Sequence, residues 1–293
     1  MRQGVLFDDL PCATYRRPKG SLLKWIGNKY RMAEEITAYF PKSFGHLLDV
    51  FLGSGAILAT VAPSAGVGSD SFKPLIDIWQ ALKADPGQLV QWYAERYRFF
   101  KSGDRAVNYE TIKARYNTGP NAADFLFLVR SCYGGVVRFR KDDGYMSTPI
   151  GIHDPISPEA FSQRVREWHR RIAGCLFRCA DYREVMKQAK DGDLVYCDPP
   201  YSYSQAILYG AQEFSLGDLL EEIELCKRRG AYVALSIDGA KRSGSFVCDL
   251  PLPPGLFERE VFIEAGRCML KRFQMAGQSL HSEEVADRLL LTY

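Results

Sequence analysis

The sequence lacks long apolar runs, repeats and low-complexity segments. No stretch reaches the roughly 18–20 apolar residues that a membrane span needs, and residues 1–20 have no apolar core of the kind found in signal peptides. We therefore expect a cytoplasmic protein that has no membrane partner. The 293 residues suffice to bury a sizeable core, and a hydrophobic content of 46% excludes disorder of the whole chain.

Paired cysteines and a large excess of charge are absent as well. The eight cysteines are scattered and form no Cys-x-x-Cys, so the sequence predicts no metal site, and we interpret all eight as reduced thiols. The formal net charge is only +3. Any binding of nucleic acid must therefore depend on local clusters of basic residues.

Short apolar runs alternate with amphipathic helical patterns. The runs that indicate buried strands are 46–51, 66–70, 176–181, 194–198, 232–237, 258–264 and 287–293. The clearest helical patterns cover 28–40, 55–62, 74–84 and 215–229. This alternation predicts a Rossmann-like α/β fold, in which a mostly parallel sheet is covered on both faces. The last two runs adjoin in sequence, so we expect one antiparallel edge.

One region interrupts the alternation. Residues 85–174 hold helical patterns and no buried-strand run, and 136–149 form a predicted β-hairpin that turns at Asp143-Gly144. We therefore expect an inserted, mainly helical subdomain over 85–174. The α/β domain then consists of 1–84 and 175–293.

A glycine-rich turn follows the first predicted strand. Residues 49–55 (DVFLGSG) lead from that strand into a helix, where glycines let a ligand approach the backbone closely. Asp70 ends the next strand, and its carboxylate can accept hydrogen bonds from both hydroxyls of a ribose. The pattern indicates a nucleoside cofactor, whereas Leu58 in the third glycine position of G-x-G-x-x-G argues against NAD. A tight turn without a ligand stays open as the alternative.

The segment Asp198-Pro199-Pro200-Tyr201 follows a predicted strand at the carboxyl edge of the sheet, where α/β proteins bind ligands. The Asp198 carboxylate and the Pro199 carbonyl form a rigid pair of acceptors, which matches the two N–H donors of an exocyclic amine. Tyr201 can stack on a flat base. An amine held in this way presents its lone pair to an electrophilic methyl group, so catalysis is mainly positioning and electrostatics. The alternative is a proline-stiffened loop in which the aspartate caps a helix.

With these motifs the sequence resembles the Dam-like, D12-class DNA adenine N6-methyltransferases over nearly its whole length. The similar segments are 23–29 (LKWIGNK), 49–55, Asp70, Asp181-Tyr182, 198–201 and 231–238 (AYVALSID). The resemblance implies a class I methyltransferase fold and S-adenosylmethionine as cofactor. It also implies site-specific methylation of N6 of a flipped-out adenine in double-stranded DNA.

The resemblance also assigns residues to roles. The catalytic residues that it implies are Asp198, Pro199, Pro200 and Tyr201. The cofactor-binding residues that it implies are Trp25, Lys29, Asp49, Phe51, Gly53, Ser54, Gly55, Asp70, Asp181, Tyr182 and Asp198. The chain departs from the family pattern at Val50, Phe72 and Gly134, which puts the ribose pocket and a GATC target in doubt.

Basic residues cluster at two places in the sequence, near the N-terminus and in 130–141, a stretch whose first part resembles the family's recognition hairpin. We assign the first cluster to phosphates and the basic residues of the second to base edges, because arginine can pair bidentately with guanine. Tyr133 would fill the gap left by the flipped base. The assigned basic residues are Arg16, Arg17 and Lys19 for phosphates, and Arg138, Arg140 and Lys141 for bases. An ordinary solvated charged face is the alternative for both clusters.

Other functions stay open at this point. The acceptor amine could be N4 of cytosine, an RNA base or a protein glutamine amide, and a DNA-binding protein that holds the cofactor without turnover is a further alternative. We expect a monomer. A restriction nuclease encoded separately, as in restriction-modification systems, stays open as a second partner.

Overall fold

The computed structural model describes residues 15–200, 214–241, 252–267 and 284–293. The strands are β1 Leu47–Asp49, β2 Gly66–Asp70, β3 Cys175–Cys179, β4 Leu194–Cys197, β5 Tyr232–Lys241, β6 Arg259–Arg267 and β7 Glu284–Leu291. The helices are α1 Ala33–Ala38, α2 Ala56–Val61, α3 Lys73–Ala84, α4 Pro86–Lys101, α5 Arg105–Thr118, α6 Ala122–Ser131, α7 Pro158–Arg171, α8 Tyr182–Met186 and α9 Leu216–Arg228, with 3-10 turns η1 Lys29–Arg31 and η2 Tyr133–Gly135. This element order confirms the predicted α/β fold.

The sheet has the strand order β3-β2-β1-β4-β5-β7-β6. β1 to β5 are parallel, whereas β7 is antiparallel to both of its neighbours. The expected antiparallel edge is confirmed, because β6 and β7 pair antiparallel at this end of the sheet, with the reversed strand β7 one strand in from the edge. Its consecutive residues Leu289, Leu290 and Leu291 are all buried, which requires cover on both faces. β6 takes the edge instead, where its Phe262 is 56% exposed.

Helices cover both faces of this sheet. Successive side chains of a strand point to opposite faces, so Leu47 and Leu48 of β1 belong to separate cores. Leu47 packs in the core that includes side chains of α1, α2 and α3, and Leu48 packs in the core that includes side chains of α8 and α9. None of the helices in the described ranges combines the length and apolarity that crossing a membrane would take.

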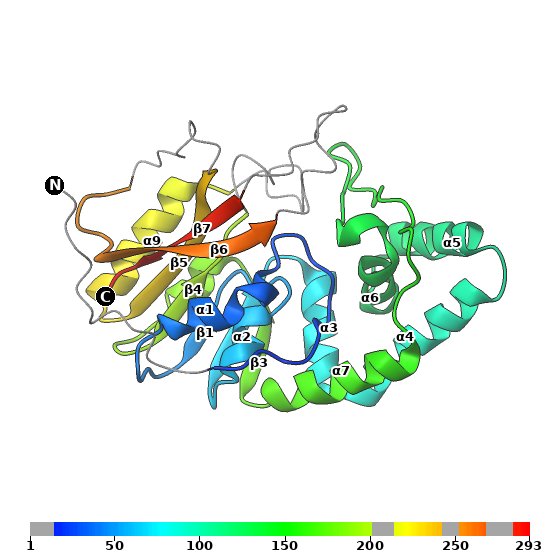
Figure 1. Cartoon of the computed structure of the whole chain (residues 1–293), viewed down its shortest axis with the longest axis horizontal. Coiled ribbons are helices and arrows are strands. Elements are labelled where there is room, and N and C mark those ends of the chain that lie inside the picture. Colours follow the sequence, from blue (N-terminus) through cyan, green and yellow to red (C-terminus); the bar gives the residue numbers. More distant parts are fainter. Residues whose placement is uncertain (1–14, 201–213, 242–251, 268–283) are drawn as a thin grey trace.

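The insert between β2 and β3 contributes α4 to α7, and α4, α5 and α6 lie beyond α3 on the side away from the sheet (Figure 1). Each of these four helices begins at a capping side chain that accepts a hydrogen bond from a first-turn N–H group. The capping residues are Asp85, Asp104, Asn121 and Ser157. The caps explain why helices start at these positions.

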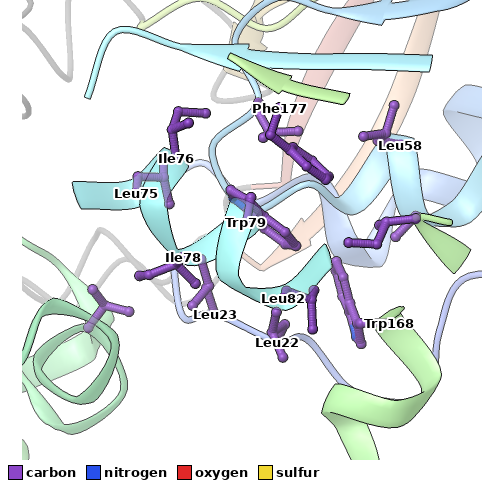
Figure 2. Packing of buried hydrophobic residues seen from close by; sticks show 14 of the residues in the cluster. Leu22, Leu23, Leu58, Leu75, Ile76, Ile78, Trp79, Leu82, Trp168 and Phe177 are labelled. Atoms are coloured by element: carbon purple, nitrogen blue, oxygen red, sulfur yellow. The ribbon is translucent and has the colours of Figure 1, made fainter. Parts of the chain in front are cut away.

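A continuous apolar core joins the insert to the sheet. Trp79 of α3 packs against Trp168 of α7, with ring centroids 5.6 Å apart, and stacks on Phe177 of β3 at 5.8 Å (Figure 2). All three side chains are buried. The insert is therefore rigidly packed against the sheet beside the ends of β2 and β3.

The segment 136–149 turns back on itself as expected, but with fewer ladder hydrogen bonds than a regular hairpin. An isolated bridge joins Phe139 to Met146, and the N–H of Arg140 donates to the carbonyl of Tyr145 at 3.0 Å. Side chains of α5 supply further support: Asn117 donates to the carbonyl of Met146 and accepts from its N–H. We call residues 136–149 the recognition loop.

Candidate active site

A cavity of about 450 Å³ opens at the carboxyl ends of β1, β2 and β4. Its wall brings together most of the residues that the sequence singled out. Those that line it are Trp25, Lys29, Asp49, Phe51, Gly53, Ser54, Asp70, Asp181, Tyr182, Asp198, Pro199 and Pro200. Gly55 is not part of the wall, and Tyr201 lies outside the described residues.

The glycine turn shapes one side of the cavity. Gly53 has a φ of 46°, and a Cβ there would lie 3.0 Å from the Trp25 indole nitrogen. Gly55 has a φ of 62°, and a Cβ there would lie 2.9 Å from the buried Trp79 ring. Glycine is therefore required at both positions, although Gly55 serves packing rather than the cavity wall. The Trp79 indole N–H donates to the Gly53 carbonyl at 3.2 Å and holds the turn in place.

Two carboxyl groups, the buried Asp49 and the half-buried Asp70, lie behind this turn. The carboxylate of Asp70 accepts hydrogen bonds from the N–H groups of Gly53 at 3.1 Å and Phe72 at 3.0 Å. Burial raises the pKa of Asp70, and these backbone hydrogen bonds oppose the rise. Asp49 is 2% exposed, and its Oδ1 has no hydrogen-bond partner within the described part of the chain. Burial, followed by the negative charges of Asp198 and Asp70, raises the pKa of Asp49 well above its usual range.

Asp49 therefore offers an acceptor that none of the described residues satisfies. A buried acceptor without a partner is costly, so its presence in a cavity wall points to a ligand that donates there. A cationic group would serve best, because it would also offset the three carboxylates that lie close together, Asp49, Asp70 and Asp198.

Aromatic rings form another part of the wall. The ring centroid of Phe51 lies 5.1 Å from that of Tyr182 and 6.0 Å from that of Phe214. Burial raises the pKa of Tyr182 to about 12, so the phenol is neutral at neutral pH. Asp181 caps α8 by accepting from the Arg183 N–H at 2.9 Å. The planes of the Phe51 and Tyr182 rings differ by 31°, and Phe214 meets Phe51 edge-on at 83°. The rings thus form an apolar, aromatic wall beside a carboxylate, which suits a purine ring.

The Asp198 carboxylate is held by a buried lysine. The Nζ of Lys29 lies 2.7 Å from Asp198 Oδ1 and 3.6 Å from Asp287 Oδ2, and Lys29 is only 3% exposed. Lys29 also donates to the Gly27 carbonyl at 3.2 Å. The sequence gives no indication that Asp287 belongs to the site, because this residue begins an apolar run that predicts only a strand. The reversed direction of β7 is what places it beside Lys29.

The family model described as D12 class N6 adenine-specific DNA methyltransferase matches residues 25–243. The chain belongs to this family. The matched range contains every residue that lines the cavity.

Three similar proteins carry names of the same kind. The retron Ec67 DNA adenine methylase of Escherichia coli is 32% identical over 190 residues, which cover 62% of this chain and 63% of that protein. The DNA adenine methylase of Vibrio cholerae is 28% identical over 229 residues, covering 74% of this chain and 80% of that one. The DNA N-6-adenine-methyltransferase of Escherichia phage P1 is 26% identical over 242 residues, which are 78% of this chain and 31% of that protein. This chain therefore spans less than a third of the phage protein.

In this D12-class chain, Phe72 links the cavity to the recognition loop. Its N–H group binds Asp70, and its ring centroid lies 5.0 Å from that of Phe125 in α6 and 5.5 Å from that of Phe139 in the loop. Phe72 is one of the positions at which the chain departs from the pattern of the family it resembles. The aromatic side chain packs the loop against the cavity wall.

The N-terminal basic residues do not line the cavity. The Arg17 guanidinium donates to the carbonyls of Tyr30 and Arg31, at 3.1 and 3.0 Å, and lies over the Tyr30 ring. Arg17 thus anchors the chain before η1. Arg16 and Lys19 are exposed, and the carbonyl of Arg16 accepts from Arg171 at the end of α7.

The basic side chains of the recognition loop are all exposed. The Arg140 guanidinium lies 4.2 Å from the centroid of the Tyr145 ring and 3.2 Å from an oxygen of Asp143. Arg138 is held through its backbone, since its N–H donates to Thr148 Oγ1 at 2.9 Å. Lys141 lies at the turn, and Tyr133, half-buried in η2, precedes the loop. The loop therefore presents three basic side chains on an ordered backbone.

Proposed function

We propose that this chain transfers a methyl group from S-adenosylmethionine to N6 of adenine in double-stranded DNA. The proposal rests on one observation above all. Asp49, Asp70 and the pair Asp198-Pro199 converge on a single cavity at the carboxyl edge of the sheet, next to a loop with exposed arginines. Family membership supports the reaction, and the cavity supports the assignment of residues.

The residues present fit the cofactor. Asp70 would accept hydrogen bonds from the ribose, and the rings of Phe51 and Tyr182 would pack on the adenine ring. Asp49, whose Oδ1 has no hydrogen-bond partner among residues 15–200, 214–241, 252–267 and 284–293, would accept from the amino group of the methionine part. Because Gly53 has no side chain, the cofactor could approach the backbone there closely; a Cβ would block that approach. When bound, the cofactor supplies an electrophilic methyl group carried on a sulfonium.

The chain's own contribution to catalysis would be to hold and orient the acceptor amine. The Asp198 carboxylate and the Pro199 carbonyl would accept the two N–H groups of the adenine amine, which favours a nitrogen whose lone pair points into the cavity. The nitrogen gains positive charge as its new bond forms, and the carboxylate of Asp198 stabilises that charge. Tyr201, outside the described residues, is proposed to stack on the base.

An adenine inside a duplex cannot reach this cavity, so the base must be flipped out. We propose residues 85–174 as the target-recognition subdomain, in an α/β domain made of 1–84 and 175–293. Tyr133 would fill the vacated position, and the basic side chains of the recognition loop would read bases. For phosphate contacts we keep Arg16 and Lys19, and we drop Arg17 because its guanidinium already binds two carbonyls.

The test is methyl transfer from labelled S-adenosylmethionine to duplex DNA, followed by separation of the nucleosides. N6-methyladenine is the expected product. N4-methylcytosine, label in RNA alone or no transfer would each overturn the proposal. Asp198→Ala should abolish transfer and leave cofactor affinity within a few-fold, whereas Asp77→Ala, which removes the half-buried carboxylate that pairs with the exposed Lys73, should leave both unchanged. Tighter binding to duplexes mismatched at the target adenine would support flipping.

A further inference from the structure

The buried contact between Lys29 and Asp287 lies beside the proposed catalytic carboxylate. Asp287 comes from β7, where it pairs in register with Ile263 of β6. Its side chain is 9% exposed, and the side chain of Lys29 is 3% exposed. A lysine ammonium has three donors and no acceptor. Here it donates to a backbone carbonyl and lies within reach of two carboxylates, Asp198 and Asp287.

Asp287 itself does not belong to the cavity wall formed by the described residues, whereas Lys29 and Asp198 do. Asp287 therefore reaches the cavity wall through its contact with Lys29. The two contacts are unequal, since the ammonium lies 2.7 Å from Asp198 and 3.6 Å from Asp287. The charge of Asp287 draws the ammonium away from Asp198, so without that charge the ammonium would shift and the Asp198 carboxylate would turn with it.

We propose that Asp287 is a positioning residue, which through Lys29 keeps the Asp198 carboxylate aligned with the Pro199 carbonyl to grip the target amine. This inference rests on the proposed function. It assigns a role in methyl transfer to a strand outside the glycine turn and the Asp-Pro-Pro-Tyr segment. The role requires the negative charge of Asp287 and not only its volume, because the ammonium responds to charge.

Asp287→Asn tests the role, since it removes the charge and keeps the shape. The rate of methyl transfer in a single turnover should fall roughly tenfold, within the range measured for coupled neighbours. The dissociation constant of S-adenosylmethionine should stay within twofold. Glu260→Gln is the matched control: it removes a carboxylate from the adjacent strand, where Glu260 pairs with Arg288, and the rate should not change.

A double-mutant cycle with Lys29→Met separates positioning from a general structural effect. If Asp287 acts through Lys29, adding Asp287→Asn to Lys29→Met should slow transfer no further. An unchanged rate in Asp287→Asn would overturn the proposal. So would a tenfold loss that persists in the Lys29→Met background, or a loss matched by weaker cofactor binding.

A crystal structure of the Asp287→Asn protein provides a readout that needs neither activity nor the Lys29→Met protein. The Lys29 ammonium should shift away from position 287, and the Asp198 carboxylate should turn with it relative to its orientation in the unaltered protein. An unmoved Asp198 overturns the proposal, whatever the rate. Absence of transfer by the unaltered protein would instead reject the proposed function, and the crystal structure would still decide the geometry.

Discussion

The cavity and the recognition loop face each other across Phe72, yet the chain builds them in different ways. The cavity wall is formed by backbone at strand ends, such as the turn at Gly53, with acidic side chains set directly into it. The loop is carried by side chains of a neighbouring helix: Asn117 of α5 binds both backbone groups of Met146, and Tyr109 donates to the carbonyl of Thr148. The cavity wall is therefore built from short contiguous motifs. The recognition loop depends on side chains that lie far from it in sequence.

This difference predicts that cofactor binding and DNA binding can be damaged separately. Substitutions in the glycine turn should weaken cofactor binding and leave DNA binding unchanged. Substitutions in α5 should weaken DNA binding and leave cofactor binding unchanged. The contact between the rings of Phe72 and Phe139 is the place where the two regions meet. Substitutions in each of the two regions should therefore have separable effects on cofactor binding and on DNA binding.

Gly53→Ala should raise the dissociation constant of S-adenosylmethionine by roughly a hundredfold, as measured by calorimetry. The new Cβ would sit at a positive φ and press on Trp25. Gly192→Ala is the matched control, because Gly192 has a φ of 77° and a Cβ there would meet nothing within 4 Å. Gly192→Ala should lower the melting temperature and leave the dissociation constant of S-adenosylmethionine unchanged. Equal cofactor affinity in the Gly53→Ala and unaltered proteins would show that the turn does not shape the site.

Asp49→Asn should weaken S-adenosylmethionine binding roughly thirtyfold, the size expected for losing a hydrogen bond to a charged group. It should also stabilise the free protein. The pKa of Asp49 is raised in the folded state, so its contribution to stability is present at low pH and is lost as pH rises through that pKa. The gain in melting temperature should therefore be larger at about pH 8 than at about pH 5.

Asp193→Asn is a control for which the change in stability with pH should have the opposite sign. Burial raises the pKa of Asp193, but hydrogen bonds from His46 and Lys190 outweigh it, and the pKa is lowered overall. Its contribution to stability is present above the unfolded-state pKa and is lost as pH falls, so this variant should melt lower at about pH 8. If Asp49→Asn also melts lower there, the Asp49 carboxylate is stabilised in a way that the structure does not show.

Asn117→Ala should weaken DNA binding roughly tenfold, because two backbone groups of the loop lose their partner. Affinity for S-adenosylmethionine should stay within twofold. Asn108→Ala is the control on the same helix, because its amide donates to the Phe99 carbonyl at 2.8 Å and not to the recognition loop. A matching loss of cofactor affinity in Asn117→Ala would contradict the separation of the two regions.

Arg138→Ala should reduce discrimination between the recognised sequence and single-base variants roughly fivefold, the lower end for a lost bidentate base contact. The measurement is relative affinity across a panel of duplexes at one salt concentration. Lys141→Ala provides the comparison within the loop. If Arg138→Ala instead weakens all duplexes equally and reduces the salt dependence, Arg138 contacts phosphate.

Much of the α/β half was predictable, because parallel strands buried on both faces appear as short apolar runs and their ends carry the ligand motifs. The strand at Gly66–Asp70 was predicted with the observed bounds. Asp198, Asp70 and Gly53 reach one cavity because the carboxyl ends of adjacent parallel strands share an edge. The N-terminal basic cluster was less informative, since the carbonyls that bind the Arg17 guanidinium could not be foreseen from composition.

The order of residues by itself determined the short buried strands, the glycine turn and the Asp198-Pro199-Pro200 turn after β4, because each depends on neighbours within a few positions. Only the tertiary structure decided that β7 lies inside the sheet and that Asp287 reaches Lys29. It also decided that Phe72 packs against the recognition loop. The physical reason is that these contacts join side chains far apart in sequence, whose meeting depends on strand direction and packing rather than on any local pattern.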